Sequence, residues 1–185
     1  MELNKYKYLD MIITDHTFLV PLDYENEDGK EISIFAREIE RKETVNKNLS
    51  YLVFFQGGPG YESPRPITDS GWIKRASEEY KVLLLDQRGT GLSNPVCGDL
   101  FKAMNDGDLA HYLTFFRADN IVRDAEEIRK NLIQDKKWSV LGQSFGGFCA
   151  TNYLSFYPNS LEKVFITGGL PPLIAHPDDI YRSTY

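Results

Sequence analysis

The chain has 185 residues, of which 42% are hydrophobic and 13% are aromatic. This length and composition predict a single domain with a substantial core, because two domains of ordinary size need a longer chain. The formal net charge is −6 and Lys and Arg do not cluster, which argues against nucleic acid as a partner. Cys97 and Cys149 are too few for a disulfide framework, and we expect Cys149 to be a small buried apolar residue.

The sequence indicates neither export nor membrane insertion. Residues 1–10 lack the apolar run of a signal peptide, and there is no apolar stretch of about 18 residues that could cross a membrane. We therefore expect a cytoplasmic protein without a membrane partner. No metal or cofactor is implied, because the histidines lack metal-ligand spacing and residues 57–60 lack the Lys-Ser/Thr pair of a phosphate-binding loop.

Two types of strand follow one another along the chain. Residues 11–21 and 32–39 are predicted strands, joined by a charged segment in which Asp28-Gly29 favours a hairpin turn. Residues 51–55 and 82–85 are continuously apolar, which is typical of strands buried on both faces. The chain is thus expected to open with an antiparallel hairpin and to continue with parallel strands.

Helices are expected between the later strands. Residues 72–80 predict a short helix, and residues 94–111 a loop or irregular helix. Residues 120–133 predict an amphipathic helix capped near Asp119 or Asn120. Its apolar face would consist of Ile121, Ala125, Ile128 and Leu132. With a last strand at 161–167, this alternation predicts a mostly parallel sheet with helices on both faces, which is the α/β class.

A serine lies where a strand is expected to turn into a helix. Gly-Gln-Ser-Phe-Gly-Gly at 142–147 separates an apolar strand predicted at 138–141 from a helix predicted at 145–156. In this setting a G-x-S-x-G motif forms a nucleophile elbow, which holds the Ser144 hydroxyl exposed on a sharp turn. Two residues before and after the serine, at Gly142 and Gly146, a Cβ atom is expected to clash with neighbouring backbone. The alternative is an ordinary glycine-rich turn with an incidental serine.

Two further glycine-rich motifs follow the predicted buried strands. They are Gln-Gly-Gly-Pro-Gly at 56–60 and Asp-Gln-Arg-Gly-Thr-Gly at 86–91. These motifs and residues 142–147, in this order, resemble the prolyl aminopeptidase (proline iminopeptidase) family of α/β-hydrolases, and the likeness extends over about residues 30–185. One departure is Gln56, where the family usually has histidine. The resemblance implies an α/β-hydrolase sheet and a serine peptidase that releases N-terminal proline from peptides, without a cofactor.

The resemblance also assigns roles to individual residues. It implies that Ser144 is the nucleophile and that the backbone N–H groups of Gly58 and Phe145 form the oxyanion hole. Arg88 is expected to bind backbone carbonyls or a nearby carboxylate, because the chemistry needs no cation there. The residues expected to shape the two loops are Gly57, Pro59, Gly60, Gly142, Gln143, Gly146 and Gly147.

The rest of a catalytic triad is not recognisable. In this fold the acid and then the histidine follow the nucleophile along the chain. After Ser144 there is one histidine, His176, and it precedes Asp178 and Asp179, the reverse of the usual order. We therefore interpret His176, like His16 and His111, as a surface or loop residue and assign no catalytic acid or base.

The chain is accordingly expected to be one part of a hydrolase. Residues 1–170 would form the N-terminal part of the core, incomplete at its C-terminal edge, and residues 171–185 the start of a cap region or a disordered tail. Such a chain is expected to be inactive alone, and its bare last strand would pair with a complementing C-terminal polypeptide or with another copy. Two alternatives stay open: another α/β-hydrolase, such as an esterase, or a degenerate binding domain without activity.

Overall fold

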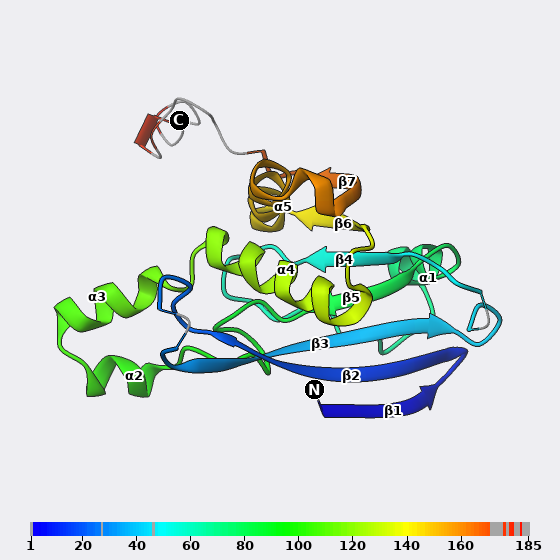
Figure 1. Ribbon diagram of the computed structural model, residues 1–185, viewed down its shortest axis with the longest axis horizontal. Helices are drawn as coiled ribbons and strands as arrows, with labels where there is room; N and C mark the ends of the chain where they lie inside the picture. Colours follow the sequence, from blue (N-terminus) through cyan, green and yellow to red (C-terminus); the bar gives the residue numbers. More distant parts are fainter. Residues whose placement is uncertain are drawn as a thin grey trace.

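The computed structural model describes residues 2–26, 28–45 and 47–170, together with residues 176, 178, 179 and 182 (Figure 1). The strands form one sheet with the order β1-β2-β3-β5-β4-β6-β7. Apart from the four isolated positions, the segment expected to begin a cap region or to be a disordered tail lies outside the described residues. None of the described helices is long and apolar enough to cross a membrane.

The antiparallel part of the sheet has one strand more than the sequence predicted. It consists of β1 (Glu2–Tyr8), β2 (Met11–Pro21) and β3 (Glu31–Arg41), each antiparallel to its neighbour. The prediction missed β1, whose side chains at residues 4–8 are exposed, because a strand that pairs with β2 mainly through its backbone needs no buried apolar face.

The predicted hairpin between β2 and β3 is present, and the charged segment that contains Asp28-Gly29 connects the two strands. The connection extends over residues 22–30, and the Leu22 N–H donates to the Lys30 carbonyl at 2.8 Å. Several polar residues thus lie between the strands, and the pairing of Pro21 with Glu31 sets the register.

The parallel part of the sheet brings the three glycine-rich motifs to one edge. The strands, in spatial order, are β5 (Lys81–Leu85), β4 (Tyr51–Phe55), β6 (Trp138–Gln143) and β7 (Leu161–Thr167). Phe55 pairs with Leu85 on one side and with Gly142 on the other. Because parallel strands end at the same edge, the loops after β4, β5 and β6 leave the sheet side by side.

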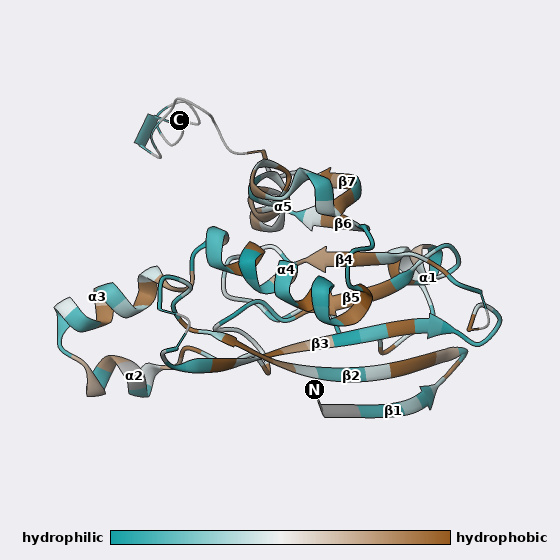
Figure 2. Cartoon of the chain, in the orientation of Figure 1, coloured by the Kyte–Doolittle hydropathy of each residue, from teal (hydrophilic) through white to brown (hydrophobic). Residues whose placement is uncertain are grey.

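Helices cover both faces of the sheet, as expected. These helices are α1 (Gly71–Ser77), α4 (Ala118–Ile133) and α5 (Phe145–Phe156), whereas α2 (Gly98–Ala103) and α3 (Asp106–Thr114) extend away from the sheet at one side of the molecule (Figure 1). One cluster of buried residues joins α4 and α5 to Val53 and Phe55, and a second joins Ile73 of α1 to Phe54 on the opposite face. Buried on both faces, β4 is brown along its length in Figure 2, whereas α4 alternates between brown and teal.

The start of α4 differs from the prediction. The helix begins at Ala118, and Arg117 occupies the N-cap position without a side-chain capping bond. The expected caps therefore lie inside the first turn, where the Asp119 carboxylate is favoured by the helix dipole. The expected apolar face is confirmed: Ile121, Ala125 and Ile128 are buried, and Leu132 packs against them at the edge of the core.

Candidate active site

Ser144 occupies the sharp turn that joins β6 to α5. Its backbone has φ 52° and ψ −118°, a conformation that is strained for any residue except glycine, and its side chain is exposed. Two backbone hydrogen bonds hold the turn: the Ser144 N–H donates to the Thr167 carbonyl at 2.9 Å, and the Gly147 N–H donates to the Ser144 carbonyl at 2.8 Å. The hydroxyl is thus held on a rigid turn outside the core.

The glycines around Ser144 allow backbone segments to touch, which confirms the expected clashes. A Cβ atom on Gly142 would lie 2.2 Å from the Gly146 carbonyl oxygen, and one on Gly146 would lie 2.0 Å from that of Phe55. Gly169 makes the same kind of contact, because its Cβ would lie 1.8 Å from the Ser144 carbonyl oxygen. Gly169 is not among the predicted site residues, although Gly168-Gly169 directly follows the last predicted strand.

The Gln-Gly-Gly-Pro-Gly loop lies directly against Ser144. A Cβ atom on Gly57 would lie 3.1 Å from the Ser144 Cβ and 3.8 Å from its Oγ. The next residue, Gly58, has φ +119° and is exposed, as are Pro59 and Gly60. The structure therefore brings together two motifs that are far apart in the sequence.

Two backbone N–H groups beside Ser144 are available to a ligand. Within the described part of the chain, the N–H groups of Gly58 and Phe145 donate to no protein acceptor. Gly58 directly follows the glycine that touches Ser144, and Phe145 is the first residue of α5, where the helix dipole is positive. An exposed hydroxyl with free amide donors nearby can serve acyl transfer, because such donors stabilise an oxyanion.

The loop after β5 supports the Gln-Gly-Gly-Pro-Gly loop from behind. The fully buried Asp86 carboxylate accepts from the Ser63 N–H at 2.9 Å and from Arg65 Nη2 at 2.8 Å. The neighbouring Gln87 donates from Nε2 to the Gln56 carbonyl at 3.0 Å. Asp86 and Gln87 thus fix both ends of the loop that faces Ser144.

Arg88 has the structural role that was expected. Its guanidinium is buried and pairs with the Asp124 carboxylate of α4, and it also donates to the carbonyls of Leu22 and Phe115 at 2.9 and 2.7 Å. Burial opposes the charge, but the Asp124 carboxylate raises the pKa of Arg88. Arg88 therefore joins three separate segments and stays ionised.

The described residues show no histidine hydrogen-bonded to Ser144. Among the described residues, no hydrogen bond joins the Ser144 hydroxyl to a histidine, and the His176 backbone N–H donates to Asp179 at 3.2 Å. The interpretation of His16 as a surface residue is wrong: it is buried on β2, with Nε2 3.1 Å from Oε2 of Glu38. Burial favours a higher pKa for Glu38, but hydrogen bonds from His16 and Tyr51 lower it.

Cys149 and the described metal-ligating side chains do not form a second reactive site. Cys149 is buried as predicted, and burial raises the pKa of its thiol to about 12, so the thiolate is not formed near neutral pH. Within the described ranges, no group of three or more His, Cys, Asp or Glu side chains could hold a metal ion.

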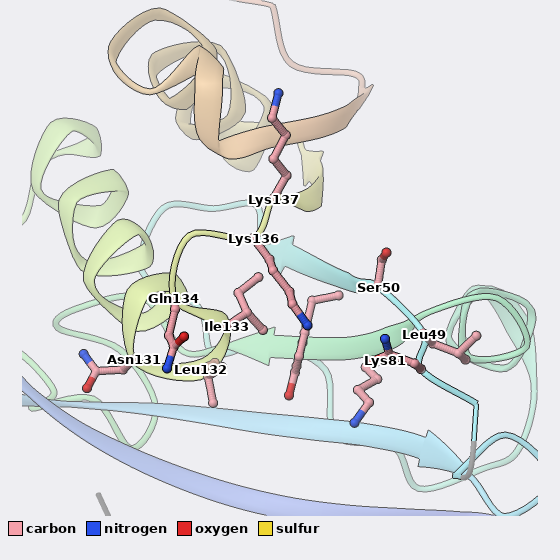
Figure 3. A pocket seen from close by; sticks show the side chains of 11 residues that line it. Leu49, Ser50, Lys81, Asn131, Leu132, Ile133, Gln134, Lys136 and Lys137 are labelled. Atoms are coloured by element: carbon pink, nitrogen blue, oxygen red, sulfur yellow. The ribbon is translucent and has the colours of Figure 1, made fainter.

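A cavity of about 370 Å³ lies at the other end of the sheet, where β4 and β5 begin and α4 ends (Figure 3). Three lysines line it, but Lys81 pairs with Glu40 at 3.0 Å and Lys137 points away from it, so Lys136 is the lysine that extends inward. Ser144 is not among its lining residues. The cavity therefore does not belong to the candidate active site.

Comparison with known proteins agrees with this geometry. Residues 51–183 match the family described as the alpha/beta hydrolase fold. The chain belongs to the α/β-hydrolase family. It is 52% identical to a proline iminopeptidase of Aeromonas sobria, over 92% of this chain and 40% of that protein. It is 42% identical to a proline iminopeptidase of Aspergillus aculeatus, over 88% of this chain and 38% of that protein.

Solved structures show the same fold at low sequence identity. A proline iminopeptidase-related protein from Thermus thermophilus aligns with a TM-score of 0.53 and 17% identity, over 82% of this chain and 44% of that one. The 2-hydroxy-6-oxo-6-phenylhexa-2,4-dienoate hydrolase from a Rhodococcus species aligns with a TM-score of 0.55 and 19% identity, over 92% and 52%. The chain thus spans about two fifths of its curated relatives and about half of these α/β-hydrolases.

Proposed function

We propose that the chain carries the nucleophile of a serine hydrolase that releases N-terminal proline from peptides. The single observation that carries the proposal is the position of Ser144: exposed at a positive φ, with Gly57 against it and two unused N–H groups beside it. The substrate class follows from the curated relatives, which are named proline iminopeptidases.

In this proposal the Ser144 Oγ attacks the carbonyl carbon of the first peptide bond and passes its proton to a general base. The carbonyl oxygen becomes an oxyanion, which the N–H groups of Gly58 and Phe145 stabilise by about 3 kcal/mol for each donor. The intermediate then expels the shortened peptide as the amine, which takes up that proton. Water hydrolyses the resulting prolyl ester and regenerates the Ser144 hydroxyl.

We also propose that a polypeptide of these 185 residues has negligible peptidase turnover. The reason is that no histidine among the described residues makes a hydrogen bond to the Ser144 hydroxyl. A serine hydrolase without its base keeps about 10³–10⁴-fold acceleration over water, which comes from the oxyanion hole and substrate binding. The base would come from a complementing polypeptide, and residues 171–185 would lead into a cap over the site.

The surface that such a polypeptide would cover is β7 with the outer side of α5. Within the described part of the sheet, β7 pairs only with β6, and Phe165 on β7 is 42% exposed. On α5, Leu154 and Phe156 are 48% and 60% exposed. An open strand edge beside exposed apolar side chains favours the addition of another strand. Light scattering tests this: we expect the chain alone to self-associate as its concentration rises and the added polypeptide to suppress that association, whereas a clean monomer at high concentration would count against the proposal.

Labelling with a fluorophosphonate tests the nucleophile. We expect slow labelling of Ser144, detected by peptide mass spectrometry, and none in Ser144→Ala. A folded chain labelled at another residue, or not at all, would contradict the assignment. Rapid hydrolysis of proline arylamide that Ser144→Ala abolishes would support the nucleophile but overturn the proposed inactivity.

A further inference from the structure

Gln56 uses its whole side-chain amide to hold the loop beside Ser144. Its Oε1 accepts from the Gly57 N–H at 2.8 Å, and its Nε2 donates to the Glu62 carbonyl at 3.2 Å. Its own carbonyl accepts from Nε2 of Gln87, which is only 2% exposed. Gln56 is therefore tied to the start of the loop, to Glu62 two residues after its end and to the loop that follows β5.

These bonds decide which amide of the loop is available. The Gly57 N–H is the first donor of the loop and lies in the residue that touches Ser144, but Gln56 already occupies it. Pro59 has no N–H to offer. The Gly58 N–H, which has no protein acceptor among the described residues, is then the first free donor.

We propose that Gln56 is a positioning residue: it occupies the Gly57 N–H, closes the loop onto Glu62 and so presents the Gly58 N–H beside Ser144. We call the two hydrogen bonds of the Gln56 amide, to Gly57 and to Glu62, the clamp. The effect of the clamp on catalysis rests on the proposed function, whereas the clamp itself can be tested without activity.

The chemistry of the side chain explains why an amide suits this position. The clamp needs one acceptor and one donor about as far apart as the two ends of an amide, and glutamine offers both at every pH. Methionine has a similar shape but no strong donor or acceptor. A glutamate carboxylate can still accept from Gly57, but it can donate to the Glu62 carbonyl only when it is protonated.

Amide hydrogen exchange, followed by NMR, tests the clamp. In Gln56→Met we expect the Gly57 N–H to exchange at least tenfold faster than in the wild type, because its acceptor is lost. The matched control is Gln134→Met, which makes the same change at a glutamine whose side chain has no hydrogen bond in the described part of the chain. Unchanged Gly57 exchange in Gln56→Met would overturn the clamp.

The binding of a prolyl boronic acid tests the positioning. The Ser144 Oγ forms a bond to boron and releases its proton to solvent, so the tetrahedral boronate mimics the oxyanion. We expect about tenfold weaker binding by Gln56→Met, less than the 10²–10³-fold effect of losing a whole oxyanion donor. For Gln56→Glu, affinity relative to the wild type should fall as pH rises from about 4 to 7, because the carboxyl loses the proton it would donate.

The outcomes separate the two proposals. If Gly57 exchange rises in Gln56→Met while boronate affinity stays at the wild-type level, the clamp is structural only and the positioning role is wrong. If the wild type itself binds no boronate, the proposed function fails, whereas the Gly57 exchange rates still decide the clamp.

Discussion

Tyr153 lies in a buried polar network that connects α4, α5 and β6, and we predict that removing its hydroxyl destabilises the fold strongly. The hydroxyl donates to Oε2 of Glu126 at 2.8 Å and accepts from Nε1 of Trp138 at 3.1 Å. Burial raises the pKa of Tyr153, so the hydroxyl keeps its proton. Its ring packs against those of Phe55 and Trp138, with centroids 6.2 and 6.3 Å away.

Tyr153→Phe preserves these ring contacts and deletes only the hydroxyl. The hydrogen bond to the Glu126 carboxylate accounts for about 1.5–3 kcal/mol, and a buried Trp138 N–H without a partner costs about 1–3 kcal/mol. Part of this loss is offset because phenylalanine has no hydroxyl to desolvate. We therefore expect the free energy of unfolding to fall by about 2–4 kcal/mol.

Urea denaturation followed by tryptophan fluorescence measures this change, and an unchanged m value shows that the unfolded state is comparable. The control is Tyr157→Phe. The ring of Tyr157 packs against that of Tyr153 with centroids 5.8 Å apart, but the Tyr157 hydroxyl makes no hydrogen bond in the described part of the chain. The control should change stability by less than about 0.5 kcal/mol. Equal losses in both variants would show that the network adds no net stability.

Three further predictions concern the same core. In Gly146→Ala the new Cβ would lie 2.0 Å from the Phe55 carbonyl oxygen, so α5 must move and stability should fall by about 1–3 kcal/mol or more in urea denaturation, whereas Gly98→Ala, with no atom within 4 Å, should change little. Arg88→Met leaves the buried Asp124 carboxylate without its cationic partner, with only the Tyr24 hydroxyl still donating to it, and should cost about 3–5 kcal/mol by the same measurement; a loss below about 1 kcal/mol would contradict the ion pair. Burial favours a higher pKa for Glu126, but hydrogen bonds from Arg129 and Tyr153 lower it below 4.5, so its stabilisation is present above pH 4.5 and lost as pH falls through the folded-state pKa. The stability difference between wild type and Glu126→Gln should therefore narrow below about pH 4.5, and a constant difference would contradict this.

The sequence alone determined the elements whose signals are local. The bounds of β4, α5 and β7 agree with the predicted ranges, because apolar runs and glycine-rich turns are readable within a few residues. The order of the three motifs was sufficient to identify the family, and the comparisons confirm that identification. Elements without a local signal were missed or misplaced: the polar edge strand β1, the uncapped start of α4 and the burial of His16.

Only the tertiary structure decided which residues of the motifs meet. Gly57 touches Ser144 because β4 and β6 are neighbours in the sheet, although α1, β5, α2, α3 and α4 separate the two strands along the chain. The need for glycine at 169, and the use of both ends of the Gln56 amide, likewise depend on contacts across the fold. The sequence shows which side chains are present. Which backbone N–H groups of the site remain free to bind a ligand depends on which of them already donate to neighbouring groups in the folded protein.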